Sequence, residues 1–179
     1  MKRIELLSTV VILGLIVTGM VAFADDRFSL TSPNGLSFGL IKGYENWPVV
    51  APSYRTDNNE IRIILGNQTI MEAYRAGVPA NGKAFPDGSI LVKIGYSERK
   101  NKAFTAAIEP DVLRRVEYMI KDAKKFGETG GWGYARFVHD AATGTFKPYG
   151  KTADFDRECF QCHKLVKDRD FVFTGYPVR

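Results

Sequence analysis

The chain contains few of the side chains that bind metals or form disulfides. Its 179 residues include two cysteines, two histidines and four methionines. A structural zinc site is built from four ligands, mostly cysteine and histidine. Cys159, Cys162 and His163 lie together, and His139 is the one further histidine. This scarcity argues against a zinc site and against a framework of disulfides.

The sequence also lacks a concentrated positive charge. Its formal net charge is +5, and the basic residues are spread along the chain with short pairs such as Arg114-Arg115. Proteins that bind nucleic acid usually gather lysine and arginine on one face or in one stripe. We therefore interpret the charge as a solvated surface and expect no nucleic-acid partner.

One long apolar run is present, at residues 6–23, after a positively charged start. It ends in the small-residue sequence AFA at residues 22–24, which an acidic pair follows. This order is typical of a cleaved export signal. We expect residues 1–24 to be removed and residues 25–179 to form one periplasmic domain with no membrane contact. The alternative is a retained anchor, because the run approaches the length that spans a bilayer.

The two cysteines belong to the sequence CFQCH, from Cys159 to His163. Two thiols three positions apart, followed directly by histidine, form the c-type haem attachment pattern. Both thiols can form thioethers with one haem, and His163 can bind its iron as the proximal ligand. A thioredoxin-like redox pair and a disulfide are alternatives, but neither requires the adjacent histidine. The pattern predicts one covalently bound haem c.

Hydrophobic periodicity predicts both strands and helices. Strands are expected at residues 60–65, 89–96, 132–138 and 171–176. Helices are expected at residues 36–47, 68–76 and 154–167. Asn67 can cap the second helix, and the third carries the haem motif. Residues 112–126 fit either period, and residues 97–102 are expected to form a charged turn.

Iron held by His163 has a second axial position, which electron-transfer cytochromes often fill with methionine. After removal of the export signal, Met71 and Met119 remain, and both fit apolar core stripes. His139 follows a predicted strand beside a turn, so it is either a surface histidine or a distal ligand. This shortage of ligands favours an open distal site for small molecules or redox catalysis.

The haem motif comes late in the chain, whereas class I cytochromes c carry it near the start. Cytochromes c′ also attach haem late, but they are four-helix bundles. The proline, glycine and strand content of this sequence does not fit such a bundle. A strand-rich domain with a late haem motif remains.

Four segments together resemble the cytochrome P-460 family. They are EIR at residues 60–62, FPDGSILVK at residues 85–93, GWGY at residues 131–134, and CFQCHK at residues 159–164 followed by FVFT at residues 171–174. The resemblance covers most of the chain after residue 24. It implies an α+β domain with an antiparallel sheet, a few short helices and a C-terminal haem-attachment helix. It also implies a homodimer.

In that family, a lysine on the DGxxxxK strand is bonded to a meso carbon of the porphyrin. The matching residue is Lys93, which without the resemblance would be read as a strand lysine that extends to solvent. A lysine buried against haem loses hydration, so its pKa falls and the neutral amine becomes available. A third covalent tether would alter the electronic properties of the haem.

The resemblance further implies oxidation of hydroxylamine to nitrous oxide, with electrons passed to an acceptor such as a small periplasmic cytochrome c. This reaction needs a base. Asp154, five residues before Cys159, matches the position of a family carboxylate, although acidic residues are also favoured at any helix start.

Relatives called cytochrome c′-beta lack the cross-link, cap the distal pocket with phenylalanines, and bind nitric oxide or carbon monoxide without turnover. Phe85 matches the position of one such cap, and it could equally be a core aromatic. Gas binding and simple electron transfer are therefore the alternatives to the enzyme.

Overall fold

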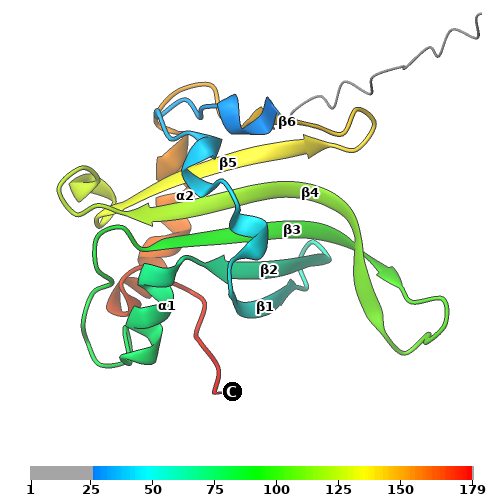
Figure 1. Ribbon diagram of the computed structural model, residues 1–179, viewed down its shortest axis with the longest axis horizontal. Helices are drawn as coiled ribbons and strands as arrows, with labels where there is room; N and C mark the ends of the chain where they lie inside the picture. Colours follow the sequence, from blue (N-terminus) through cyan, green and yellow to red (C-terminus); the bar gives the residue numbers. More distant parts are fainter. Residues whose placement is uncertain (1–25, 179) are drawn as a thin grey trace, which may run out of the picture.

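The computed structural model describes residues 26–178, so the predicted export signal lies outside the described residues. Its centre is a six-stranded antiparallel sheet in which each strand pairs with the next along the chain (Figure 1). The strands are β1 (Val49–Arg55), β2 (Glu60–Gly66), β3 (Ile90–Lys100), β4 (Ile108–Lys121), β5 (Trp132–Asp140) and β6 (Thr145–Pro148). This sheet and the short helices around it confirm the expected α+β fold.

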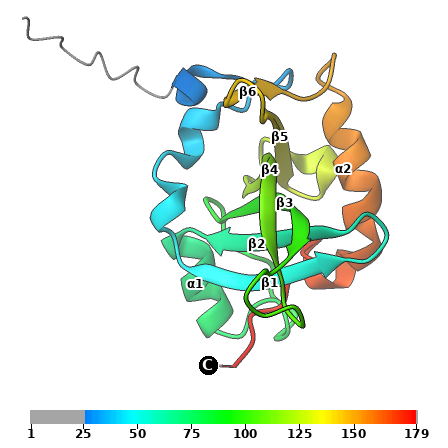
Figure 2. The same cartoon turned by 90° about the vertical axis from the view of Figure 1, so that its right-hand side faces the viewer.

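Short helices lie on both sides of the sheet, which Figure 2 shows nearly edge on. One side carries the 3₁₀ helices η1 (Asp26–Ser29), η2 (Phe38–Ile41) and η3 (Tyr44–Asn46). The other side carries α2 (Phe155–His163) and the 3₁₀ helix η5 (Lys164–Arg169), and the C-terminal segment then passes below the β1 edge of the sheet. The remaining helices are α1 (Gln68–Arg75), which follows β2, and η4 (Gly127–Thr129), which precedes β5.

The alternation of side chains along the strands divides the core into two clusters. The cluster on the side of η2 and η3 includes Leu65, Val92, Val116, Tyr118, Ala135 and Phe137. The cluster on the side of α2 includes Ile64, Leu91, Met119, Trp132, Tyr134 and Val172. Successive strand residues point to opposite faces, so Lys93 shares the α2 side with Leu91.

Asn67 caps α1 as expected and also attaches it to the sheet. Its Oδ1 accepts hydrogen bonds from the backbone N–H groups of Ile70 and Ile90, each at 3.1 Å. Its side-chain amide donates to the carbonyl oxygen of Gly88 at 2.8 Å. One side chain therefore both satisfies the helix start and fixes it beside the start of β3.

The C-terminal part departs from the expected helix and strand. The α-helix ends at His163, and the chain continues as η5 to Arg169. Asp170 and Phe171 then adopt positive φ angles of 48° and 63°, in the left-handed region that non-glycine residues rarely occupy. The strand expected at residues 171–176 is absent because the chain turns there and continues in an irregular path.

Several strands differ from the expectations for physical reasons. β4 shows that most of the ambiguous residues 112–126 are strand, and its pairing extends β3 through the expected turn at residues 97–102 as far as Lys100. β1 was not expected because it contains Pro52, but it is an edge strand, where a missing N–H is tolerated. The helix expected at residues 36–47 is divided into η2 and η3.

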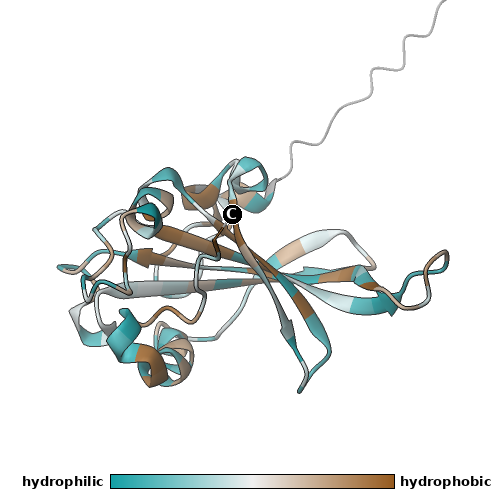
Figure 3. Cartoon of the chain, turned by 90° about the horizontal axis from the view of Figure 1, so that it is seen from below, coloured by the Kyte–Doolittle hydropathy of each residue, from teal (hydrophilic) through white to brown (hydrophobic). Residues whose placement is uncertain are grey.

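The β1–β2 and β3–β4 hairpins extend beyond the helices as two arms (Figure 3). The β3–β4 arm exposes Phe104, Ile108 and Val112. The two buried clusters lie at the end of the sheet away from these arms, where the helices cover it.

Within residues 26–178, no helix is both long enough and apolar enough to cross a membrane.

Candidate haem-binding site

A cavity of about 480 Å³ lies between α2 and the face of the sheet that carries Lys93. The last turns of α2 contribute Cys159, Cys162 and His163 to its wall, and β3 contributes Lys93. Cys159 is partly buried and Cys162 is exposed. The volume is within the range of small-molecule and cofactor pockets. The structure thus brings four of the predicted site residues to one cavity.

His163 is oriented by the segment that follows η5. Its Nδ1 lies 2.7 Å from the carbonyl oxygen of Phe171. A carbonyl only accepts hydrogen bonds, so Nδ1 carries the proton and Nε2 keeps a free lone pair. The ring also packs against Tyr134 and Phe173, with centroid distances of 5.0 and 5.1 Å.

This environment fits a ligand to haem iron. Metal-binding histidines usually donate their other N–H to a carboxylate, a carbonyl or water, as His163 does. Burial lowers the pKa of His163, which favours the neutral imidazole that binds a metal. His163 therefore has the tautomer and the protonation state that a proximal haem ligand requires.

The sheet side of the cavity is apolar at one end and charged at the other. The apolar end contains Leu91, Met119 and Tyr134, which are neighbours in the strand register. The charged end contains Arg62, Lys93, Arg115, Glu117 and Arg136. A porphyrin combines a flat apolar ring with carboxylate side chains, so an amphipathic wall of this kind suits it.

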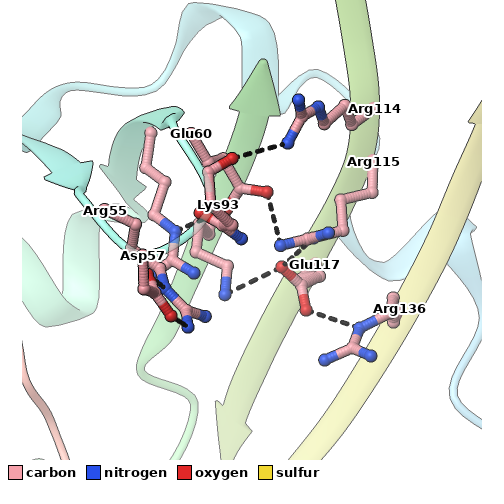
Figure 4. Close-up of polar contacts among 10 residues, drawn as sticks. Arg55, Asp57, Glu60, Lys93, Arg114, Arg115, Glu117 and Arg136 are labelled. Carbon is pink, nitrogen blue, oxygen red and sulfur yellow. Dashed lines mark hydrogen bonds and ion pairs between the residues drawn. The ribbon is translucent and has the colours of Figure 1, made fainter. Parts of the chain in front are cut away.

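Lys93 pairs with the residue directly opposite on β4. Lys93 and Glu117 are partners in the strand register, and Nζ lies 2.8 Å from Oε2 (Figure 4). Arg136 and Arg115 bind the same carboxylate through Nε, at 2.6 and 3.0 Å. Burial by itself would raise the pKa of Glu117, but the three cations lower it to about 2. Burial also lowers the pKa of Lys93, and Glu117 offsets only part of this effect.

A second buried carboxylate supports the charged end. The fully buried Glu60 accepts hydrogen bonds from Arg62 Nε at 2.6 Å and pairs with Arg115 Nη2 at 2.5 Å. A Cβ at Gly95 would lie 3.2 Å from the Glu60 carboxyl carbon, so the glycine provides the space. Removing one partner of a buried pair typically costs about 3–5 kcal/mol. Glu60 therefore holds two of the arginines that surround Lys93 in place.

The family model for cytochrome P-460 matches residues 41–174, which are 134 of the 179 residues. The chain belongs to the cytochrome P-460 family. The matched range includes Lys93 and the whole haem motif. Among curated proteins, no significant match to the chain is found. Family membership makes the protein a haem protein with covalently bound haem, and it is consistent with a haem oxidoreductase.

The state of Cys159 agrees with this family. Burial raises the pKa of its thiol to about 11, so the group is protonated at neutral pH. Catalytic redox pairs instead lower the pKa of their attacking cysteine, because the thiolate is the nucleophile. Cys159 and Cys162 are also free rather than joined in a disulfide. The raised pKa of Cys159 argues against the thioredoxin-like alternative, and two free thiols are what haem attachment requires.

The structure does not bring Asp154 or Phe85 to the cavity wall. Asp154 lies exposed at the start of α2, 3.4 Å from Arg157 Nε. Phe85 is buried in the core, where its ring contacts Tyr74 and Trp132 at centroid distances of 5.0 and 6.0 Å. The base and the distal cap assigned to these residues by the family resemblance stay predictions.

The structure also shows where the other candidate iron ligands lie, namely His139, Met71 and Met119. His139 hydrogen-bonds the carbonyl oxygen of Leu113 through Nδ1 at 3.1 Å and packs against Phe146, on the side of the sheet away from α2. This position favours the interpretation as a surface histidine. Met71 is a core residue, as expected, whereas Met119 is buried and also lines the cavity.

Sequence reasoning missed Glu117, the arginines around it, and the carbonyl of Phe171. Arg62 and Arg136 lie in the middle of predicted strands, at positions that alternation assigns to the same face as apolar residues. A charged residue at such a position is a signal in the sequence for a buried polar site. Glu117 lay in the segment whose secondary structure was ambiguous. The contact of Phe171 with His163 depends on a turn that no local sequence pattern predicts.

Proposed function

We propose that this cytochrome P-460 protein is an exported c-type haem enzyme that oxidises hydroxylamine to nitrous oxide. In this proposal His163 is the proximal ligand and Lys93 is bonded to the porphyrin. The observation that carries it is the presence of Lys93 in the wall of the cavity that also contains the haem motif. A lysine that merely extended to solvent would not share a cavity with that motif.

When bound, the haem supplies an iron that accepts electrons from the substrate. Two molecules of hydroxylamine that become one nitrous oxide and one water lose four electrons and four protons. Side chains near the substrate must receive the protons, and the electrons must leave to an acceptor. We propose a small periplasmic cytochrome c as this acceptor.

Lys93 must lose its proton before Nζ can bond to carbon. Burial favours this loss because it lowers the pKa of Lys93. The new C–N bond replaces one N–H and one C–H bond, so two electrons and two protons pass to a two-electron oxidant such as a peroxide. Glu117 keeps Arg115 and Arg136 as partners when the Lys93 charge disappears, so no buried carboxylate is left unpaired.

Two carboxylates of the α2 segment are candidates for the base. Asp154 matches the family position, whereas Glu158 lines the cavity and accepts a hydrogen bond from the Tyr149 hydroxyl at 3.3 Å. We propose that one of them receives protons from hydroxylamine. Asp154→Ala and Glu158→Gln are compared for turnover, and the base is the residue whose loss slows oxidation by roughly a hundredfold or more. Full activity in both variants would remove this assignment and leave the enzyme proposal intact.

The decisive experiment concerns Lys93. Peptide mass analysis of the exported protein should find the Lys93 peptide joined to the haem peptide that contains Cys159 and Cys162. The ferrous Soret band should be strongly red-shifted, and the protein should consume hydroxylamine with an electron acceptor. Lys93→Leu should give an ordinary haem c spectrum and no turnover. Lys100→Leu, an exposed lysine change on the same strand, should leave both properties unchanged.

Gas binding without turnover is the second candidate, and one observation favours it. The Lys93–Glu117 ion pair holds Nζ as an ammonium, which has no lone pair for bond formation. If the pair persists in the haem protein, Lys93 stays unbonded and the protein resembles cytochrome c′-beta. A wild-type protein without the cross-link, which binds nitric oxide and leaves hydroxylamine untouched, would establish this candidate.

We also propose export and dimerisation. The mature protein should begin near residue 25 in a periplasmic fraction, which N-terminal sequencing of that fraction would test. Analytical ultracentrifugation should give twice the mass of one chain. A monomer at micromolar concentration would remove the homodimer and would not affect the haem chemistry.

A further inference from the structure

The turn after η5 contains a buried ion pair that the haem chemistry described above does not use. Lys121, the last residue of β4, lies with its Nζ 2.7 Å from Oδ1 of Asp170. The side chains are 6% and 10% exposed. An ion pair this deeply buried loses hydration on both sides, so its value depends on the further hydrogen bonds that each partner makes.

Those further contacts are present. Lys121 Nζ donates to the carbonyl oxygen of Gly130 at 3.1 Å and lies 5.0 Å from the centre of the Trp132 ring. The second carboxylate oxygen of Asp170 accepts a hydrogen bond from the backbone N–H of Phe85 at 2.8 Å. The Asp170 carbonyl oxygen accepts another from Trp132 Nε1 at 2.9 Å. Asp170 is therefore held through both carboxylate oxygens and its backbone.

This network holds the chain in an unfavourable backbone conformation. Asp170 and Phe171 both have positive φ angles, a backbone conformation that is unfavourable for residues with a side chain. The Phe171 ring is packed against Gly130 so closely that a Cβ there would lie 2.3 Å from a ring carbon. Such a conformation persists where the surroundings determine it strongly. The carbonyl oxygen of Phe171, in this same turn, accepts the Nδ1 proton of His163 at 2.7 Å.

We propose that Lys121 and Asp170 are positioning residues that hold the Phe171 carbonyl in place and thereby set the strength of its hydrogen bond with His163. The inference rests on the proposed ligation of iron by His163, but not on the Lys93 cross-link or on turnover. A strong Nδ1–H···O bond increases the electron density on the imidazole. An electron-rich axial ligand stabilises the ferric state, so it lowers the reduction potential of the haem.

The proposal predicts a definite direction of change. When the ion pair is removed, the turn relaxes toward ordinary backbone angles and the Phe171 carbonyl moves from His163. The iron–histidine bond then weakens and the ferrous state becomes relatively more stable. The iron–histidine stretching frequency should fall, and the one-electron equilibrium should shift by tenfold or more toward the reduced form, which is a rise of about 59 mV.

The test uses the complete haem protein with the changes Asp170→Asn and Lys121→Met. Asp170→Asn keeps an acceptor for Phe85 N–H but loses the charge that pairs with Lys121. Resonance Raman of the ferrous protein gives the stretching frequency, and redox titration gives the potential. Lys121→Arg keeps the positive charge, so its stretching frequency and reduction potential should lie closer to the wild-type values than those of Lys121→Met. Asp168→Asn, an exposed aspartate two positions away, should change neither.

Two comparisons separate this proposal from general loss of stability and from the enzyme proposal. Asn67→Ala weakens the fold at a site away from the turn and should leave the frequency and the potential unchanged. The same measurements in a Lys93→Leu background should show the same shifts, since no cross-link is needed. Unchanged values in Asp170→Asn and Lys121→Met would overturn the proposal. An absent iron–histidine band in the wild type would overturn the ligation by His163 and the proposal with it.

Discussion

The partly buried Lys93 and the buried Lys121 lie on the same face of the sheet, and they differ in how their charges are held. Lys121 has Asp170 as its carboxylate, together with a carbonyl oxygen and an aromatic ring. Lys93 lines the cavity and shares the carboxylate of Glu117 with two arginines. Its side chain is 28% exposed, against 6% for Lys121.

The difference separates a charge that supports the fold from one that can be given up. Deprotonation of Lys121 would leave Asp170 as a buried carboxylate without its counter-charge, which is costly. Deprotonation of Lys93 leaves Glu117 with two arginines, so the remaining charges stay paired. A reactive lysine and a structural lysine can therefore lie on one sheet face, distinguished by whether the partner carboxylate has other cations.

The largest predicted contrast is in stability. Lys121→Met should lower the free energy of unfolding by about 3–5 kcal/mol, because it leaves Asp170 unpaired in the core. Lys93→Met should lower it by about 1 kcal/mol or less, because Glu117 keeps Arg115 and Arg136. Chemical denaturation followed by circular dichroism measures both values. Equal losses would show that the two lysines are held alike.

Acid should affect the Lys93 region through Glu117. The pKa of Glu117 is about 2 in the folded protein, against 4.5 for an unperturbed glutamate. Glu117 therefore contributes stability above pH 4.5, and this stability is lost as the pH falls toward 2. The shift corresponds to at most roughly 3 kcal/mol. Denaturation at a series of pH values should give a shallower decline in Glu117→Gln than in the wild type. Identical slopes would mean that the three cations do not hold Glu117 in solution.

Gly130→Ala tests the Lys121 region from the opposite side. The added Cβ would meet the Phe171 ring at 2.3 Å, and φ at this position is +70°. Overpacking and strain together should cost about 2 kcal/mol or more. Gly144→Ala is the matched control, because φ there is +69° and nothing lies within 4 Å of the new Cβ. A loss in Gly130→Ala no greater than in the control would contradict the close packing of Phe171.

A similarly small effect is predicted at Asn67, which serves as a reference remote from both lysines. Asn67→Ala removes the cap of α1 and its links to β3, and should cost about 1 kcal/mol of unfolding free energy. Asn67→Asp, which keeps an acceptor oxygen, should recover most of this loss. A change in the haem spectrum of Asn67→Ala would show that the haem site depends on fold stability in general.

Local patterns were sufficient for the parts of the fold whose cause is local. The haem motif depends on spacing within one helix turn, and the cap of α1 depends on one side chain next to its own helix. Alternation of apolar residues predicts β2, the first part of β3 and most of β5. The edge strand β1 and the irregular segment after Phe171 were missed, because pairing and a buried turn override local propensity there.

The sequence by itself determined the haem motif and, through family resemblance, the antiparallel α+β character and the choice of Lys93 as a candidate site residue. Only the tertiary structure decided which carboxylate Lys93 and Lys121 each contact. Glu117 is opposite Lys93 because of the register between β3 and β4, and Asp170 reaches Lys121 across 49 positions of the chain. Such contacts depend on how strands align and layers pack, and a one-residue change of register would turn every side chain of a strand to the other face.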